Sequence, residues 1–437
     1  MPMHLKYLFF LFCVLSLSGF CDVSYANTAL ADPHSQTAPG NPSIENPTGP
    51  LSLNKALSLG LLQNPELAAF SLEIRSSEAR ALQAGLFPNP EVETSVENFG
   101  GEDEQSGFKS AETTVQVNQL IETAGKRLKR KQVADLETKL AHLDYESKRL
   151  DVFNEISGAF WDVCAAQEHL AISRELARLS EETYTTVAER VRAGKVPPVE
   201  ELQAKVSLTT ARIELEQTRH SLEAARKRLV AAWGSTTPMF EAVTGQMDAI
   251  TPIPPLDELE DKIIGNPDVA RWTTEIETKS AAVTLSDAQA IPDVTIGAGP
   301  RYYNETENTA FVMSLSVPIP LFNRNQGEKQ EALHDLSKAR QEQRAAYVNT
   351  RAALGQAYQD LSAAALSASA LKEVVANAAE SAFQSTLEGY REGKFSYPHV
   401  LEAQRTLFEV KQQHLLALGD YHKARTAIER LIGQTLP

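Results

Sequence analysis

An internal duplication is the feature that most constrains how this chain can fold. Residues 64–67 (Asn-Pro-Glu-Leu) lead through a helical stretch to residues 90–92 (Pro-Glu-Val). Residues 266–269 (Asn-Pro-Asp-Val) lead by the same spacing to residues 292–294 (Pro-Asp-Val). A repeat of this length is best identified before any other pattern, because a missed repeat leads to the wrong fold.

The repeat continues beyond these landmarks. The segment 192–196, with Gly194, returns as 392–395, with Gly393, and the Trp-Gly pair at 233–234 returns as Ile-Gly at 432–433. Both halves therefore follow one plan: a helix, two short strands, a very long helix, a Gly turn and a returning helix. We place the first repeat at 51–234, a proline-rich linker at 235–256 and the second repeat at 257–437.

The N-terminus has the pattern of a secretory signal. Lys6 precedes an apolar run over residues 7–20, and residues 24–26 (Ser-Tyr-Ala) form a small-x-small cleavage site. We expect a signal peptide at 1–26, with a rival cut after residues 29–31. A membrane anchor is the competing interpretation, but the apolar run is short for a spanning helix. Residues 27–50 are rich in Pro, Asn, Ser and Thr, which predicts an extended arm.

The cysteines and the net charge limit the chemistry. Cys13 and Cys21 fall within the signal, so Cys164 is alone in the mature chain and cannot form an internal disulfide. Lipidation of Cys21 is an alternative, but Phe20 places a bulky residue where lipoprotein signals have a small one, so we expect none. The net charge of −15 argues against nucleic acid, whose binding needs basic patches.

Two segments in each repeat alternate with a period of two residues. We predict strands at about 91–98 and 112–120 in the first repeat, and at about 293–303 and 310–318 in the second. Their length suits a tilted strand that crosses a bilayer, but four strands cannot close a barrel, for which about eight are needed. Because open edges are not tolerated in lipid, we expect the chain to oligomerise, and three copies would give twelve strands. Two ordinary soluble hairpins are the alternative.

Each pair of strands is followed by a helical hairpin, at about 124–232 and about 327–431. The first arm of each is nearly seventy residues long and so on the order of 100 Å, which exceeds the helices of globular domains. Sparse Gly and Pro in these tracts, and many Ala residues, favour antiparallel coiled-coil packing.

Several motifs together resemble the TolC family of outer-membrane factors, from residue 51 to residue 433. Segments 86–90 (Leu-Phe-Pro-Asn-Pro), 97–101, 119–122 and 125–127, with 317–327 in the second repeat, are similar to the cobalt-zinc-cadmium branch. The resemblance implies a mainly α chain with a small β part that forms a homotrimer: a twelve-stranded β-barrel in outer-membrane lipid above a long α-helical periplasmic tunnel. It also implies docking to a periplasmic adaptor and an inner-membrane RND pump.

The resemblance also assigns candidate functional residues. The Tyr-x-x-Gly turn at Tyr390 and Gly393 matches the periplasmic entrance of the family, and we expect the helix tips to dock the adaptor. These tips comprise Gly194, Lys195, Tyr390, Gly393 and Lys394.

Family members often carry two acids on one helical face just past this turn, where they form a ring that selects cations. This sequence keeps Glu402 but has His399 at the earlier position, so the predicted ring is mixed, and a plain surface pair is the alternative. Glu200 and Gln203 occupy the matching places in the first repeat.

The join between strands and helices carries further candidates. Pro318 and Pro320 remove backbone donors where the last strand ends, which suits a strand-to-helix corner. Lys126 and Arg127 begin the first long helix, and we weigh a salt bridge to Glu122 against contact with lipid headgroups.

The sequence shows no constellation for catalysis. The turn at 192–195 lacks the spacing of a phosphate loop, and there is no His-Glu-x-x-His segment and no nucleophile elbow. We therefore expect no enzyme, no cofactor and no bound metal, and predict a passive duct for heavy-metal cations in a tripartite efflux system. A drug-efflux or type I secretion duct is the alternative with the same fold, and a periplasmic coiled-coil scaffold is the alternative from another class.

Overall fold

A computed structural model of the chain describes residues 46–436. The predicted signal peptide, Cys21 and all but the last residues of the predicted arm lie outside the described residues. The fold is mainly helical with a small β part, as the sequence predicted. Among the described residues, no helix combines the length and the apolar character needed to cross a membrane.

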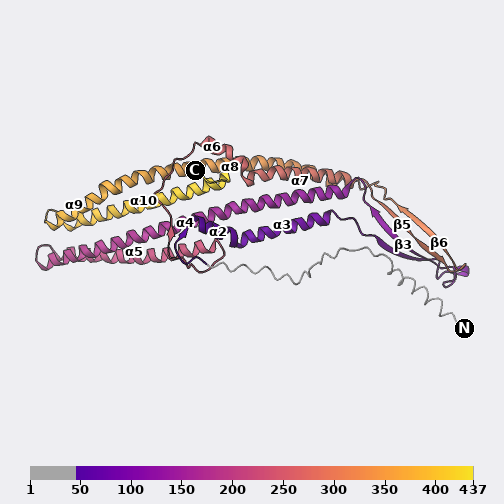
Figure 1. Cartoon of the computed structure of the whole chain (residues 1–437), viewed down its shortest axis with the longest axis horizontal. Helices are drawn as coiled ribbons and strands as arrows, with labels where there is room; N and C mark the ends of the chain where they lie inside the picture. The colour runs from indigo at the N-terminus through magenta and orange to yellow at the C-terminus, as the bar shows by residue number, and fades with distance from the viewer. Residues whose placement is uncertain (1–45, 437) are drawn as a thin grey trace, which may run out of the picture. The chain divides into compact units, whose positions relative to one another are not determined.

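The first repeat begins with a two-residue strand and ends with a long helical hairpin (Figure 1). Its elements are β1 (Leu51–Ser52), α2 (Leu53–Gln63), α3 (Pro65–Ala84), β2 (Glu91–Glu97), the short 3-10 turn η2 (Asp103–Gln105), β3 (Glu112–Ile121), α4 (Lys126–Arg192) and α5 (Pro198–Ala231).

The second repeat follows the same order after the linker, which contributes β4 (Val243–Thr244). Its elements are α6 (Leu256–Lys262), the 3-10 turn η3 (Ile263–Gly265), α7 (Pro267–Gln289), β5 (Val294–Tyr303), β6 (Asn308–Ser316), α8 (Gln326–Val374), η4 (Val375–Ala379), α9 (Glu380–Arg391) and α10 (Tyr397–Ile432).

The two long helices differ at one point. α4 runs for 67 residues without interruption, whereas a five-residue π-helical turn, η4, separates α8 from α9. The expectation of one continuous helix over 327–391 is therefore wrong at this turn. A π turn places an extra residue in one helical turn and is often found at functional sites.

The helices pack around α4. This helix contacts α3, α5, α7 and α10, while α8 packs on α7 and α10. One hydrophobic cluster lies near the Gly turns and includes Phe383, Tyr390, Tyr397 and Leu407. A second lies where α6, α8 and α10 meet.

The same clamp closes each repeat. Asn64 accepts hydrogen bonds from the backbone N–H groups of Glu66 and Leu67 at the start of α3, and its amide donates to the Ala232 carbonyl at 2.8 Å. Asn266 caps α7 by accepting from the backbone N–H of Asp268, and it donates to the carbonyls of Arg430 and Leu431. The two Asn-Pro pairs that reveal the duplication therefore tie the helix before the strands in each repeat, α3 or α7, to the end of the last helix of that repeat.

The four longer strands form one antiparallel sheet in the order β2-β3-β5-β6. The register places apolar residues opposite apolar ones, for example Val92 opposite Val117 and Ala298 opposite Met313. One face is consequently apolar yet exposed, with Val92, Phe311, Met313 and Leu315 each more than 70% exposed. β2 and β6 are the outer strands, and each has one edge without a partner strand within the described residues.

The other face of the sheet is polar and charged. The Arg301 guanidinium lies 3.0 Å from a Glu112 carboxylate oxygen and 3.3 Å from one of Glu97, and donates to the Thr114 hydroxyl. Glu93 accepts hydrogen bonds from the side-chain amides of Gln116 and Asn118. Carboxylates therefore outnumber cations on this face.

Candidate functional site

The tips of the two helical hairpins are joined by one polar network. Arg190, near the end of α4, donates to the backbone carbonyl of Tyr390 in α9, and its guanidinium lies 4.5 Å above the Tyr390 ring. The Tyr390 hydroxyl donates to a Glu200 carboxylate oxygen on α5 at 3.2 Å. These three residues, which we call the tip latch, link α4, α5 and α9.

The Tyr390 side chain is held by burial as well as by hydrogen bonding. It is 1% exposed, and its ring packs edge-on against Tyr397 with centroids 6.2 Å apart. Burial, followed by the nearby Glu200 carboxylate, raises the pKa of the Tyr390 phenol to about 12. The hydroxyl therefore remains a donor to Glu200 throughout the physiological pH range.

Each turn at the tips requires a glycine. Gly194 and Gly393 have φ values of 70° and 84°, a left-handed conformation that costs glycine little. The backbone N–H groups of Lys195 and Lys394 donate back to carbonyls of the preceding helix at 2.9 and 2.8 Å, as in a helix C-terminal cap. Both lysine side chains are exposed beyond the tips.

The predicted gate residues lie in different surroundings. Glu200 is part of the tip latch. His399 is exposed and shares a hydrogen bond with the Ser396 hydroxyl at 2.9 Å through Nδ1. Gln203 and Glu402 are exposed and line a groove between α5 and α10. The structure therefore brings Gln203 and Glu402 to one groove and places Glu200 in a separate contact.

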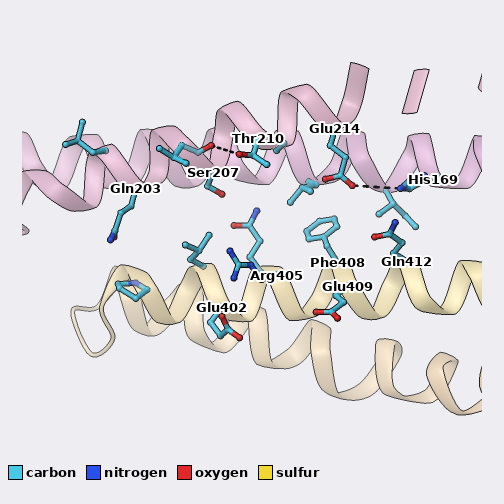
Figure 2. Close-up of a pocket in the computed structure, with 18 residues that line it drawn as sticks. His169, Gln203, Ser207, Thr210, Glu214, Glu402, Arg405, Phe408, Glu409 and Gln412 are labelled. Carbon is cyan, nitrogen blue, oxygen red and sulfur yellow. Dashed lines mark hydrogen bonds and ion pairs between the residues drawn. The ribbon is translucent and has the colours of Figure 1, made fainter. Parts of the chain in front are cut away.

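The groove has a volume of about 790 Å³ and is floored by α4 (Figure 2). Gln203, Arg405 and Phe408 point into it from α5 and α10, and apolar side chains such as Leu202 and Val206 form much of its wall. Gln404 is 2% exposed and donates to Ser180 at 2.9 Å, but its amide oxygen has no partner among the described residues.

Sequence reasoning missed Arg190, Gln404 and Arg405. Arg190 aligns with Gly389 in the second repeat, so the duplication gave no signal for it. Gln404 and Arg405 lie on a long helix whose polar positions look alike in sequence. Only the packing of α10 against α4 and α5 distinguishes them.

The corner between sheet and helices is held by ion pairs. Lys126 lies 2.8 Å from Asp293, and Arg130 lies 2.6 Å from Glu122. Arg127 stacks 4.0 Å above the Phe87 ring and donates to the Gly85 carbonyl. The salt bridge from Lys126 or Arg127 to Glu122, one of the two alternatives weighed, is not formed, because Arg130, one turn further along α4, takes that carboxylate.

The predicted corner prolines lie between β6 and α8. Pro318 and Pro320 follow the last residue of β6 and are exposed. The chain reaches α8 through Asn325, whose φ of 58° is left-handed.

In the part of the chain that the structure describes, no group of three or more His, Cys, Asp or Glu side chains is arranged to hold a metal ion. Cys164 is buried, and burial raises the pKa of its thiol to about 12, so it is not a thiolate ligand near neutral pH.

The fold and the joined helix tips define a class of protein: a duplicated, mainly helical chain in which a small sheet with an exposed apolar face adjoins long helical hairpins. The chain matches the family model described as "Outer membrane efflux protein" over residues 56–235 and 259–434. The chain belongs to this family, and the resemblance drawn from its motifs is confirmed. The family is one of channel proteins rather than enzymes.

Individual relatives are similar over most of the chain. The cobalt-zinc-cadmium resistance protein CzcC of Cupriavidus metallidurans is 33% identical over 387 residues, which cover 88% of this chain and 91% of that protein. The nickel and cobalt resistance protein CnrC of the same organism is 29% identical over 68% of this chain and 69% of its own.

Solved structures show the same fold. A structure of CusC matches with a TM-score of 0.76 and 17% identity, covering 87% of this chain and 92% of that one. The outer membrane protein VceC from Vibrio cholerae matches with a TM-score of 0.72 and 18% identity, covering 88% and 97%.

Proposed function

We propose that this chain is the outer-membrane channel of a tripartite efflux system and that it passively conducts heavy-metal cations to the cell exterior. The observation that carries the proposal is the near-full-length similarity to a protein named for cobalt, zinc and cadmium resistance. The predicted signal peptide and the exposed apolar face of the sheet support a location in the outer membrane.

The contacts between the two repeats support assembly of several copies. Within the chain, the long helix of the first repeat, α4, packs on α7 and α10 of the second. In the second repeat the long helix is α8, and the helices equivalent to α7 and α10 are α3 and α5. Among the described residues, α8 does not pack on α3 and α5 to a comparable extent. In a ring, α8 of one copy meets α3 and α5 of the next, and every repeat is then equally surrounded.

The sheet supports the same arrangement. β3 of the first repeat pairs with β5 of the second, whereas the equivalent pairing of β6 with β2 is not made among the described residues. Pairing between copies satisfies both edges, which membrane-embedded strands require. Proteins of this family form trimers, and three copies supply twelve strands for a closed barrel with the apolar face towards lipid and the polar face towards the lumen.

We assign the helix tips to partner docking and to the entrance. Proteins of this family work with a periplasmic adaptor and an inner-membrane pump. The exposed turns at Gly194, Lys195, Gly393 and Lys394 are the proposed adaptor contacts, and the groove between α5 and α10 offers adjacent apolar surface. His399, Glu402, Glu200 and Gln203 are the proposed entrance residues, with Tyr390 holding the tips together through the latch.

Selection of the metal is assigned to the pump and adaptor. A wide, water-filled channel makes few contacts that differ between ions, so it discriminates weakly. The carboxylates of the sheet's polar face would still favour cations as a class.

A deletion strain tests the assignment of cargo. Growth is measured across graded cobalt, zinc, cadmium, nickel, copper and silver, beside a panel of drugs and detergents, with the intact gene and an empty vector as matched complementations. We expect hypersensitivity confined to one or a few metals and restored by the gene. Sensitivity to drugs alone, or loss of a secreted protein, would overturn the metal assignment and favour a drug-efflux or secretion duct.

A fractionation experiment tests the location and the assembly. We expect the protein in the outer-membrane fraction and, in mild detergent, at three times the mass of one mature chain. Recovery in the soluble periplasmic fraction would overturn the channel proposal and favour a coiled-coil scaffold.

A further inference from the structure

An apolar surface without a covering lies at the corner between the sheet and the helices. Ile319 and Phe322, in the segment between β6 and α8, are 78% and 91% exposed, and Leu321 and Ile291 beside them are also exposed. We call these four residues the corner patch. Such large side chains, grouped and exposed to solvent, mark an interaction surface.

The corner patch continues the apolar face of the sheet. Along β6, Phe311, Met313 and Leu315 alternate on that face, and Val317 carries the exposed apolar row on to Ile319. Whatever covers the sheet's apolar face therefore reaches the corner patch without a break.

Unpaired positive charge lies beside this surface. The first six residues of α4 read Lys-Arg-Leu-Lys-Arg-Lys, with no acid in the first turn, although the net charge of the chain is −15. Cations at a helix N-terminus are electrostatically unfavourable, because the helix dipole is positive there. An anion nearby would offset this cost.

Carboxylates among the described residues pair with only some of these cations. Lys126 pairs with Asp293, Arg130 with Glu122 and Lys131 with Asp135. Within residues 46–436, the side chains of Lys129 in α4 and Arg324 beside Phe322 make no ion pair or side-chain hydrogen bond. Among the described residues, Lys129 and Arg324 are therefore cations without an ion-pair partner. Arg324 is two residues from Phe322, and Lys129 is three residues along α4 from Lys126, which lines the same corner as Ile319 and Phe322.

We propose that the corner patch lies at the headgroup level of the periplasmic leaflet of the outer membrane, with Phe322 at the boundary with the acyl chains and with Lys129 and Arg324 binding phospholipid phosphates. The inference rests on the proposed function, since it needs the sheet to be in lipid. Aromatic side chains and cations at this depth are typical anchors, because one end of the site is apolar and the other carries anionic phosphates.

Lipid fits the surface better than a protein partner does. The patch joins a face that in the proposed barrel meets acyl chains, and the Lys129 and Arg324 charges at its edge match phosphate. Glu328, in the first turn of α8, is an exposed carboxylate four residues from Arg324. Each cation close to an anionic membrane contributes enough to favour an anionic over a neutral lipid by about fivefold.

Fluorescence quenching of the full chain in lipid tests the depth. Phe322→Trp is reconstituted into bilayers of brominated phospholipid, and the signal of the native tryptophans, Trp161, Trp233 and Trp272, is taken from the unsubstituted protein. Met313→Trp reports the middle of the sheet and Phe395→Trp reports the helix tip. We expect strong quenching at position 313, quenching at 322 by bromine placed near the headgroup, and none at 395.

The outcomes separate this inference from the proposed function. Quenching at 313 without quenching at 322 would show a membrane-inserted sheet whose corner patch is covered by protein or water, and would overturn the inference alone. No quenching at either 313 or 322 would overturn the proposed location itself.

A competition experiment tests the charge. Quenching of the Phe322→Trp protein is compared between brominated phosphatidylglycerol and brominated phosphatidylethanolamine. We expect a preference for the anionic lipid of about fivefold or more, lost when Lys129→Gln and Arg324→Gln are added. The double variant Lys205→Gln and Lys227→Gln, which removes the same charge from exposed sites on α5, should keep it. Equal quenching by both lipids would overturn the electrostatic attraction of Lys129 and Arg324 to anionic headgroups.

Discussion

Tyr390 shows how one side chain can couple segments that are far apart in sequence. Its backbone carbonyl accepts a hydrogen bond from the Arg190 guanidinium, and its hydroxyl donates one to the Glu200 carboxylate. One buried residue therefore holds both hairpin tips together. The contact depends on a neutral phenol, which burial and the adjacent carboxylate maintain by raising its pKa to about 12.

Tyr390→Phe should loosen the tips without disturbing the fold. The substitution removes the hydrogen bond to Glu200 and leaves the ring in place, at a cost of about 1 kcal/mol in the free energy of unfolding. We expect larger or more frequent open events in single-channel recordings of the reconstituted protein. Tyr347→Phe, at a partly exposed tyrosine of α8, is the matched control, and identical conductance of both variants would contradict a latch at Tyr390.

His422 predicts a dependence of stability on pH. It is 4% exposed, stacks on Trp161 with ring centroids 3.7 Å apart, and shares a hydrogen bond with the Met247 carbonyl. Burial lowers its pKa below the usual 6.5, with the nearby Arg425 acting in the same direction. The unfolded chain therefore binds a proton at this histidine more readily than the folded chain does. The stability that neutral His422 contributes is fully present above about pH 6.5 and is lost as the pH falls towards the lower pKa of the folded state.

Thermal unfolding between pH 7.5 and pH 5.5 measures this effect. The free energy of unfolding should fall with acidification by at most about 1.4 kcal/mol per pH unit from this group. His422→Gln should give a shallower dependence, and His142→Gln, at an exposed site on α4, should not. An unchanged slope for His422→Gln would assign the pH effect elsewhere.

Some residue roles followed from sequence and others depended on packing. The Asn-Pro pairs and the Gly turns were visible because helix caps and left-handed turns have strong local preferences. The salt bridge that was weighed between Lys126 or Arg127 and Glu122 is not formed, because closeness in sequence does not determine which turn of a helix faces a carboxylate. The predicted ring of His399 and Glu402 belongs to an assembly and stays a prediction.

At the scale of elements, Asn64 and Asn266 should each contribute more to the free energy of unfolding than an exposed helix cap does. Asn64→Ala removes two hydrogen bonds at the start of α3 and leaves the buried Ala232 carbonyl without its donor. Asn266→Ala removes one hydrogen bond at the start of α7 and the donor to the carbonyls of Arg430 and Leu431. We expect each change to lower the free energy of unfolding by about 2 kcal/mol. Denaturant midpoints measure it, with exposed Asn54→Ala in α2 as control; a loss no greater than that of the control would refute the clamp.

The elements themselves were largely predictable. The alternation of apolar and polar residues located the four strands, because one face of the sheet is apolar along its whole length and the other is polar. The parallel pair of β1 with β4 was not anticipated, since two residues carry no periodicity. The π turn η4 was also missed, because its sequence, Val-Ala-Asn-Ala-Ala, carries no signal that separates a π turn from an ordinary helix.

At the scale of the whole molecule, Arg301 moderates the charge of the sheet's polar face. Its positive charge partly neutralises the carboxylates of Glu97 and Glu112. In a ring of three copies, its removal would take three positive charges from the lumen. Arg301→Gln should therefore raise the preference for cations.

Reversal potentials in a potassium chloride gradient measure this preference. The potential of Arg301→Gln should shift in the direction of cation selectivity, while Arg301→Lys should stay close to the native value because it keeps the charge. A shift of equal size in both variants would indicate that the hydrogen bonds of the guanidinium, and not its charge, control selectivity.

The closure of each repeat on itself has an evolutionary consequence. Asn64 closes the first repeat and Asn266 closes the second, each without the other, so a half-length ancestor would already have carried a complete clamp. Six such subunits offer as many strands as three copies of the present chain. Fusion of the duplicated gene could keep the ring intact while allowing the halves to diverge. The π turn is present in one half only, a difference that six identical subunits could not carry.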